Sequence, residues 1–247
     1  CEGIKNFLNN NQDVFIYACG DEKELSSLND NERVKIVHTT EVVPMECGAM
    51  QVMRMKNSSM MKAISLFNDE HVDAAVSAGS TGGFLSLATL KLKLIPGIER
   101  AALISPFPTK TGKPVAILDI GASNENTPSQ LVQFAAMGKI YSQAIFNNEL
   151  PRVYLLSNGT EEKKGSPVGK EAYQLLKVSN FDGFCGNIEA REALSGVADV
   201  IVSEGYTGNV FLKSTEGVAK MMSDMIKGAF KRKKKKKIGY LFARKGF

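Results

Sequence analysis

Short apolar runs alternate with helix-length segments along most of this chain. Eight runs have the composition of strands: residues 14–18, 34–37, 74–77, 101–105, 115–119, 152–156, 181–185 and 198–203. Strands that alternate with helices predict a mostly parallel sheet covered by helices on both faces, a three-layer α/β/α architecture.

Three helix starts can be read from local chemistry. The segment 127–146 begins with a Thr-Pro pair and the segment 166–178 with a Ser-Pro pair. Each pair supplies an N-cap followed by a first-turn proline. Ser58 or Ser59 can cap a further helix over 60–67 in the same way.

A glycine-rich turn is the most informative stretch of the chain. Residues 76–83 read Val-Ser-Ala-Gly-Ser-Thr-Gly-Gly, and the helix-compatible segment 84–94 follows. The free N–H groups and positive dipole end of such a helix start can bind an anion. If the run 74–77 is a buried parallel strand, the turn lies at the carboxyl edge of the sheet, where α/β folds bind ligands. We therefore expect phosphate here; the alternative is a tight turn without a ligand.

Polar loops follow several other predicted strands. They cover residues 119–125, 157–165, 186–191 and 203–209. In a parallel sheet these loops emerge at one edge, so their Gly, Asn, Lys and Arg residues should converge around a cleft. Turn chemistry alone can explain part of the glycine content, because Gly and Asn tolerate positive φ.

Several common catalytic patterns do not occur in the sequence. The two histidines, His38 and His71, lie in no His-x-x-x-x-Asp arrangement, and there is no Gly-x-Ser-x-Gly elbow. Hydrolase-type nucleophilic catalysis is therefore poorly supported. The phosphate-binding loop of NTPases and the Gly-x-Gly-x-x-Gly fingerprint of nicotinamide enzymes do not occur either.

Composition narrows the class of protein. With 247 residues, of which 43% are hydrophobic, the chain can bury a sizeable core as one large α/β domain or two interlocked subdomains. The cysteines, Cys1, Cys19, Cys47 and Cys185, form no Cys-x-x-Cys pair. They indicate free thiols in a reducing compartment, with no metal site. Because no initiator Met or leader opens the chain, we expect the natural N-terminus to lie before residue 1.

Positive charge is concentrated near the end of the chain. The net charge is +5, and the run 231–237 carries seven positive charges, so the remainder carries −2. Before this run, the segment 210–230 has a Met/Val/Ile/Phe face of helical spacing, and an apolar segment, 238–242, follows. This pattern predicts an amphipathic helical hairpin with a basic tip over 210–247. The alternative is a lysine face that is simply solvated.

The motifs, taken in order, resemble a known family. They cover residues 38–43, 54–60, 77–83, 118–122, 133–138, 164–165, 186–191 and 205–209. They are similar to the bacterial phosphate acyltransferase family PlsX, which converts an acyl thioester on acyl carrier protein and inorganic phosphate into an acyl phosphate. The resemblance implies the architecture of phosphotransacetylases and isocitrate/isopropylmalate dehydrogenases, as a homodimer. It also implies a catalytic body over 1–209 that lacks a first strand and the last strands.

The implied reaction assigns roles to residues of this chain. It requires no metal, nucleotide or other cofactor. The expected catalytic residues are Lys164, Asn187, Arg191 and Asn209. The expected substrate-binding residues are Arg54, Lys56, Ser77, Gly79, Ser80, Thr81, Gly82, Asp119, Gly121, Glu189, Thr207 and Gly208. Among these, Asp119 and Glu189 are expected to orient the cations rather than to carry protons.

Some positions depart from the family pattern. Ser80, Ser123 and Ser157 stand where Asn is usual, and Glu204 stands where Asp is usual. The three Asn-to-Ser changes remove amide donors from the loops.

The resemblance also implies partners and a location. The expected partners are acyl carrier protein, inorganic phosphate, a second copy of the chain, and a membrane glycerol-phosphate acyltransferase that takes the product; no nucleic acid is expected. The protein would be cytoplasmic and bound peripherally to the membrane. The expected membrane contacts are Lys233, Lys234, Lys235, Lys236, Leu241 and Phe242. Two rival functions remain: a phosphotransacetylase that uses coenzyme A, and a non-enzymatic module that binds nucleic acid or an anionic surface.

Overall fold

The computed structural model describes residues 1–231 of the chain. The chain divides into two compact units, Cys1–Gly97 and Ile98–Phe247. This division lies far from the boundary at 209–210 that the sequence suggested.

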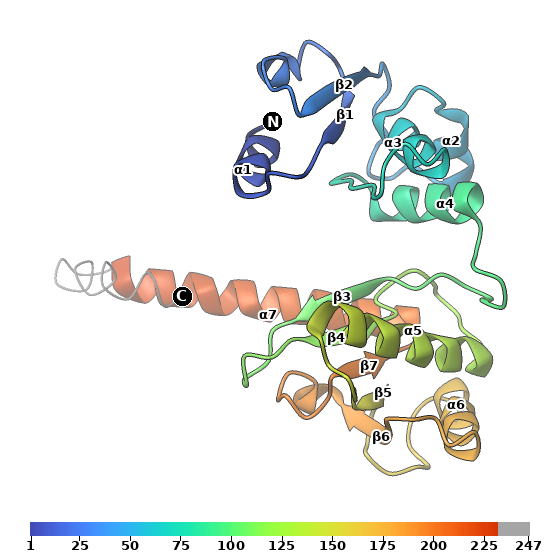
Figure 1. The fold of residues 1–247 in the computed structure, drawn as a ribbon. Coiled ribbons are helices and arrows are strands. Elements are labelled where there is room, and N and C mark those ends of the chain that lie inside the picture. Colours follow the sequence, from blue (N-terminus) through green and yellow to red (C-terminus); the bar gives the residue numbers. More distant parts are fainter. Residues whose placement is uncertain (232–247) are drawn as a thin grey trace. The chain divides into compact units, whose positions relative to one another are not determined.

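Unit 1 consists of a two-stranded parallel sheet and four helices (Figure 1). Its elements are α1 (Glu2–Asn10), β1 (Ile16–Gly20), the 3₁₀ turn η1 (Ser26–Leu28), β2 (Val34–His38), α2 (Ala49–Arg54), α3 (Ser59–Asn68) and α4 (Thr81–Leu92). In the sheet, Ile16 lies opposite Val34 and Gly20 opposite His38.

Helices α2, α3 and α4 enclose a small apolar core. The buried members of this core are Val43, Cys47, Val52, Met60, Met61, Ile64 and Leu87. The predicted cap of α3 is confirmed, because the Ser58 hydroxyl accepts the N–H of Met61. Both ends of the glycine-rich turn are thus anchored to a packed three-helix cluster.

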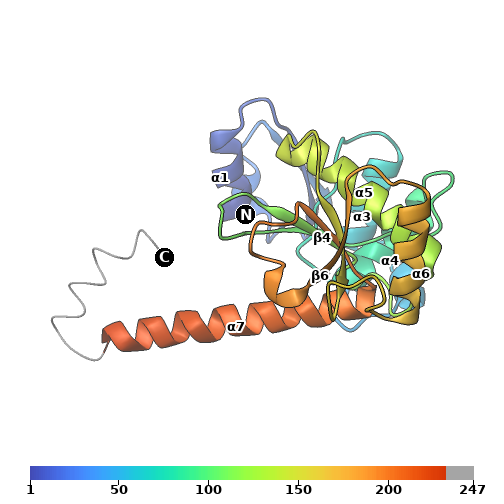
Figure 2. The same cartoon turned by 90° about the horizontal axis from the view of Figure 1, so that it is seen from below.

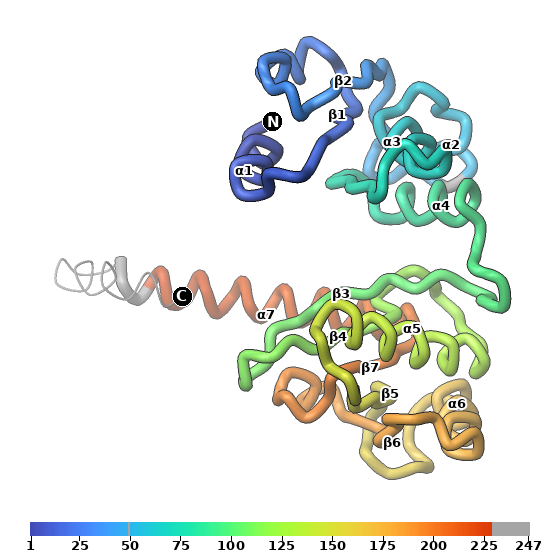
Figure 3. The backbone as a smooth tube through the Cα atoms, viewed as in Figure 1, coloured from blue at the N-terminus to red at the C-terminus, as the bar shows by residue number. Residues whose placement is uncertain are grey.

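Residues 74–77 do not form the predicted strand. The chain between α3 and α4 runs without helix or strand (Figure 3), and Val76 is 91% exposed. A strand needs a neighbour that pairs with its N–H and C=O groups, and in the described part of unit 1 β1 and β2 pair only with each other. The small side chains of the Ala-Ala-Val-Ser run also bury little apolar area. The predicted position of the turn at a sheet edge is therefore wrong. A helix does follow as expected, but α4 begins at Thr81, within the glycine-rich turn, rather than at 84.

Unit 2 contains a five-stranded sheet. Its elements are β3 (Ile104–Phe107), β4 (Val115–Leu118), α5 (Pro128–Phe146), β5 (Val153–Ser157), α6 (Pro167–Val178), β6 (Phe184–Glu189), η2 (Ala190–Glu192), β7 (Val200–Val202) and α7 (Gly205–Lys231). The strand order is β3-β4-β7-β5-β6, and every pair is parallel except β3 with β4. The prediction of a mostly parallel sheet is confirmed, with one antiparallel edge strand.

Alternating side chains of the central strands build two cores. Ala116 and Leu118 pack with α5 and α6 on one face. Val115 and Ile117 belong to the core on the other face, against which Phe211 of α7 packs. Unit 2 therefore has the expected three layers. The capping predictions for α5 and α6 are also confirmed, since their N-cap side chains accept N–H groups of the first turn.

Helix α7 begins earlier than the sequence suggested. It starts at Gly205 rather than at 210, so residues 205–209, expected to form a loop, are its first turn (Figure 2). The proposed boundary at 209–210 falls inside this helix. The basic run beyond Lys231, the second half of the hairpin and all six expected membrane contacts lie outside the described residues. No helix in the described part is long and apolar enough to cross a membrane.

Candidate functional site

The first turn of α4 presents two N–H groups without a protein partner. The Ser80 hydroxyl accepts the N–H of Gly83 at 3.2 Å and donates to the carbonyl of Met45 at 3.1 Å. This buried serine is therefore the helix cap. In the part of the chain that the structure describes, no acceptor binds the N–H of Thr81 or Gly82. A Cβ on Gly82 would meet no atom within 4 Å, so an anion can approach both groups.

The turn before α4 is held by its own side chain. The Ser77 hydroxyl accepts the N–H of Gly79 at 3.1 Å, and both residues are exposed. A Cβ on Gly79 would lie 3.0 Å from the Met60 methyl, so the chain passes close to α3 here. The hydroxyl hydrogen of Ser77 has no acceptor among the described residues and is available for a ligand.

Two exposed cations belong to the same unit. Arg54 ends α2, and Lys56 follows two residues later. Helix α2 packs beside α4, since a Cβ on Gly83 would lie 3.4 Å from Val52. Neither cation forms an ion pair with a described residue, so both charges are available to an anion in unit 1.

Loops after three strands of unit 2 meet at the carboxyl edge of the sheet. The N–H of Gly205, after β7, donates to the Asn126 side chain in the loop after β4 at 3.0 Å. The Ser166 hydroxyl, in the loop after β5, donates to the Glu204 carboxylate. The predicted convergence is thus confirmed for the loops after β4, β5 and β7. Residues 186–189, expected to form a further loop, belong to strand β6 instead.

The Asp119 carboxylate is fully buried and accepts five hydrogen bonds. Its oxygens accept the N–H groups of Leu103, Gly121, Ala122 and Ser123 and the Ser123 hydroxyl, at 2.7–3.1 Å. It forms no ion pair with any described Lys or Arg. The expectation that Asp119 orients a cation is therefore wrong, because backbone dipoles compensate its charge instead.

The first turn of α7 packs directly against this aspartate. A Cβ on Gly205 would lie 2.5 Å from Asp119 Oδ2, and a Cβ on Gly208 would lie 1.9 Å from the Asp119 carbonyl oxygen. On the exposed side, Asn209 lies beside Gly121, whose φ is +128°. Glycine is required at both helical positions by this close approach.

The remaining expected residues of unit 2 are exposed or bonded to nearby residues of the same unit. The Lys164 side chain is exposed and forms no ion pair with a described residue. The Asn187 amide donates to the Glu161 carbonyl oxygen at 2.8 Å, and the same oxygen accepts the N–H of Lys164. Arg191 pairs with Glu189 at 2.6 Å, as the sequence analysis expected. Thr207 is an exposed residue of the α7 first turn.

Carboxylates already lie beside the starts of α6 and α7. The Glu204 carboxylate is hydrogen-bonded to the α6 cap Ser166, and Asp119 lies against Gly205 of α7. A second negative charge at either start would be repelled. In the described chain no carboxylate hydrogen-bonds the first turn of α4, which makes α4 the most favourable of these three starts for an anion.

Two of the three serines that stand where the family pattern has Asn take part in local hydrogen bonds. Ser80 caps α4, and the Ser123 hydroxyl joins Asp119 to the Asn126 amide. Ser157 differs, because its buried hydroxyl oxygen has no partner among the described residues.

Two pKa shifts lie away from these residues. Burial of Asp199 by itself would raise its pKa, but hydrogen bonds from Arg152 outweigh that effect and hold the pKa below its usual value. Asp199 directly precedes β7, and Arg152 directly precedes β5. Both therefore lie at the edge of the sheet opposite the polar loops. Burial raises the pKa of Tyr154 on β5.

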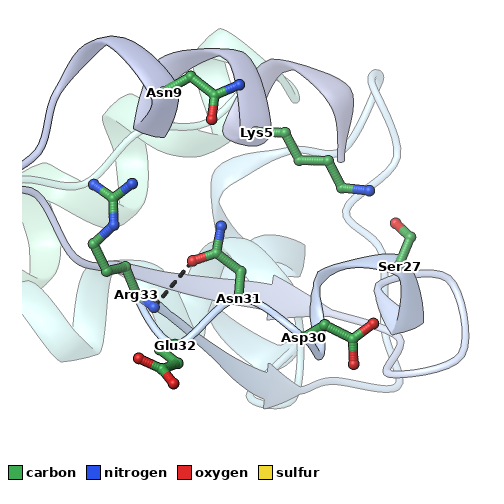
Figure 4. Close-up of a pocket in the computed structure, with 7 residues that line it drawn as sticks. All are labelled: Lys5, Asn9, Ser27, Asp30, Asn31, Glu32 and Arg33. Carbon is green, nitrogen blue, oxygen red and sulfur yellow. Dashed lines mark hydrogen bonds between the residues drawn. The ribbon is translucent and has the colours of Figure 1, made fainter.

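A separate cavity of about 630 Å³ lies beside α1 and the start of β2 (Figure 4). Lys5, Asn9 and Ser27 line it, together with Arg33. The Arg33 guanidinium donates to the Leu8 carbonyl oxygen, so this residue closes the end of α1. None of the expected substrate residues lies in this cavity.

Comparison with known proteins identifies the family. A family model described as "Fatty acid synthesis protein" matches residues 1–247. The chain belongs to this family, the PlsX family. It is 43% identical over 220 residues to a phosphate acyltransferase from Streptococcus pyogenes serotype M5 (strain Manfredo), and equally so to one from serotype M49 (strain NZ131). The match covers 88% of this chain and 66% of each relative, so the chain spans slightly less than two thirds of their length.

Solved structures confirm the fold of this PlsX-family chain. A EutD phosphotransacetylase from Staphylococcus aureus matches with a TM-score of 0.61 and 20% identity, covering 86% of this chain and 76% of that one. A phosphotransacetylase from Streptococcus pyogenes matches with a TM-score of 0.58 and 15% identity, covering 83% and 82%. The phosphotransacetylase-like α/β fold expected from the sequence is therefore shown.

Sequence reasoning missed one part of this site. Asn126 joins the β4 loop to α7 through Gly205 and to α5 through Gln130. Its position immediately before the Thr-Pro helix start was the available signal, because Asn at such a position commonly hydrogen-bonds nearby backbone.

Proposed function

We propose that this PlsX-family protein transfers a fatty acyl group from acyl carrier protein thioester to inorganic phosphate, producing an acyl phosphate for phospholipid synthesis. One observation supports the proposal most directly. A chain 43% identical to proteins named phosphate acyltransferase presents an uncapped pair of N–H groups, on Thr81 and Gly82, at a helix start without a hydrogen-bonded carboxylate.

In unit 1 we assign the α4 start to phosphate. The N–H groups of Thr81 and Gly82 would bind its oxygens, with the Ser77 hydroxyl as a further donor. Arg54 and Lys56 supply positive charge that no described carboxylate neutralises. Phosphate bound in this way is a partly dianionic nucleophile near neutral pH, so it needs no general base to attack.

The chemical step balances without a cofactor. A phosphate oxygen attacks the thioester carbonyl carbon, the C–S bond breaks, and the carrier leaves as a thiolate. Because a thiol has a pKa of about 8.5, the leaving group requires no strong acid. Positioning of the two reactants can supply about 7–11 kcal/mol of the barrier reduction.

In unit 2 we assign Asn209 and Asn187 to the thioester oxygen. Asn209 is exposed at the first turn of α7, and Asn187 has one amide N–H committed to Glu161 and one remaining. A single donor to a developing oxyanion contributes about 3–4 kcal/mol. Lys164 is available to compensate the negative charge that develops on the thioester oxygen. The charge of Arg191 is already partly neutralised by its ion pair with Glu189.

The acyl donor distinguishes this proposal from its nearest rival. A phosphotransacetylase would use acetyl-coenzyme A with phosphate, and the structural likeness supports the fold alone. The test compares acyl carrier protein thioesters with coenzyme A thioesters of the same acyl chain. We expect a higher kcat/KM with the carrier protein; equal or better turnover with coenzyme A would contradict the assignment.

We also propose that two copies pair through α7. Val218, Met221, Met222 and Met225 are 51–66% exposed and follow the helical spacing i, i+3, i+4 and i+7, so they form one apolar stripe. Met222→Glu should weaken a dimer in sedimentation experiments. Lys220→Gln, an exposed change of equal charge on the opposite face of the same helix, serves as the control. A monomeric wild-type protein at micromolar concentration would contradict the pairing.

The basic run supports a proposal of peripheral membrane binding near an acyltransferase that takes the labile product. Each Lys near an anionic surface contributes about 1 kcal/mol. Changing Lys234, Lys235 and Lys236 to Glu should release the protein from anionic vesicles and leave turnover in solution intact. If the wild type binds neutral and anionic vesicles equally well, the proposal of electrostatic membrane binding is contradicted.

A further inference from the structure

The Asp119 carboxylate joins three segments at the carboxyl edge of the unit 2 sheet. It accepts the N–H of Leu103 just before β3, and three N–H groups and a hydroxyl from the loop that follows it. The third segment is the start of α7, where Gly205 lies against one carboxylate oxygen. A carboxylate offers about four lone-pair directions, so five donors leave no capacity for a substrate.

The two faces of the α7 first turn have different surroundings. Gly205 and Gly208 are buried against Asp119 and share one face because they are three residues apart. Tyr206, Thr207 and Asn209 are exposed. The N–H groups of Tyr206 and Thr207 have no acceptor among the described residues.

Asn209 is connected to Asp119 by two routes. Its Cγ atom would lie 3.3 Å from a Cβ on Gly121, and the N–H of Gly121 donates to Asp119 Oδ1. It also directly follows Gly208, which touches the Asp119 carbonyl oxygen. A shift of Asp119 or its loop therefore moves the Asn209 amide.

We propose that Asp119 is a positioning residue for acyl transfer. It fixes the first turn of α7, and with it the Asn209 amide, without touching substrate. The inference rests on the proposed function, because it presumes that Asn209 acts on the thioester.

The test uses the full chain with three variants. Asp119→Asn replaces one acceptor oxygen by an NH₂ group, which cannot accept the hydrogen bonds that this oxygen accepts. Ser123→Ala removes one of the five hydrogen bonds to Asp119, together with the hydroxyl that accepts the Asn126 amide. Gly217→Ala, further along α7 with no atom within 4 Å of its Cβ, is the control. Steady-state kinetics with acyl carrier protein thioester and phosphate are combined with amide hydrogen exchange.

We expect Asp119→Asn to lower kcat by about tenfold or more, with a phosphate KM within about threefold of wild type. Exchange should accelerate in residues 120–123 and 205–209, while the central strands stay protected. Gly217→Ala should change neither the kinetics nor the exchange in residues 120–123 and 205–209. A raised phosphate KM with kcat intact would overturn the proposal, since it would place Asp119 on the substrate. Unchanged kinetics or unchanged exchange in a folded Asp119→Asn would also overturn it.

If Asp119→Asn does not fold, Ser123→Ala is used to test the positioning role of Asp119. A fall in kcat together with faster exchange in 205–209 supports the proposal, and the absence of either contradicts it. If the wild type shows no phosphate-dependent transfer, the proposed function fails by itself, and the exchange data still decide whether Asp119 holds the α7 start.

Discussion

Gly208 packs onto the backbone of Asp119, since a Cβ at this glycine would lie 1.9 Å from the aspartate carbonyl oxygen. No real Cβ comes so close to a backbone oxygen, so either the helix or the loop would have to shift. The first turn of α7 and the loop after β4 are therefore packed backbone to backbone. This contact determines where the exposed residues of that turn lie.

Gly208→Ala should destabilise the protein by about 1–3 kcal/mol, the usual cost of overpacking, and lower turnover. Gly217→Ala on the same helix meets no atom within 4 Å and should stabilise the protein by up to about 1 kcal/mol. Urea denaturation measures both. Equal effects of the two substitutions would show that the contact with Asp119 has no energetic consequence.

Gly82→Val should abolish phosphate-dependent turnover and leave the fold intact. The added side chain enters open space over the unpartnered N–H groups of α4, where it blocks an anion without displacing protein atoms. Gly3→Val is a matched control, because Gly3 is also the second residue of a helix in unit 1 with no neighbour within 4 Å. Phosphate kinetics and circular dichroism are the measurements. Similar losses of activity in both variants would rule out a specific role for the α4 start.

Lys164→Ala should lower kcat or raise the KM for the acyl carrier protein thioester, with little change in melting temperature. The side chain is exposed and unpaired among the described residues, so its removal costs little stability. Lys163→Ala, the exposed neighbour, is the control and should retain wild-type kinetics. If Lys164→Ala melts several degrees lower, the lysine is structural and its proposed role is wrong.

The pair Arg152 and Asp199 should make stability depend on pH. The pKa of Asp199 is lowered, so its contribution is present above the ordinary value of 3.8 and is lost as the pH falls through the folded-state pKa. Asp199→Asn should cost about 1.5–3 kcal/mol at neutral pH, because Asp199 accepts hydrogen bonds from a guanidinium.

Denaturation at neutral and acidic pH tests this sign. The difference in unfolding free energy between wild type and Asp199→Asn should shrink as the pH falls below the pKa of an ordinary aspartate. Asp224→Asn, an exposed change of the same kind on α7, is the control. If this difference in unfolding free energy instead grows as the pH falls, the pKa of Asp199 is raised rather than lowered.

Features set by neighbouring residues could be predicted from the sequence. Thr127 and Ser166 cap α5 and α6 as expected, because a cap depends on a hydroxyl and the first-turn N–H groups alone. The alternation of strands and helices likewise predicted the parallel sheet of unit 2 and its polar loops at one edge.

Features set by distant contacts could not be predicted. The run 74–77 has a strand-like composition, but pairing with another strand is a property of the whole fold. Gly205 and Gly208 indicated a loop because glycine disfavours helices, yet close packing against Asp119 requires glycine inside α7. Asp119 was expected to lie near cations because a buried carboxylate needs compensating charge or hydrogen bonds. Its actual partners are backbone N–H groups that come together only in the folded loop, so the sequence could not reveal them.

The most direct test of the account is to identify the product by mass spectrometry. The protein is incubated with a long-chain acyl carrier protein thioester and phosphate labelled with heavy oxygen. We predict an acyl phosphate that retains all of the label, formed together with free carrier thiol, because a phosphate oxygen attacks the thioester carbon. Free fatty acid without acyl phosphate, or thioester consumption independent of phosphate, would contradict the central claim.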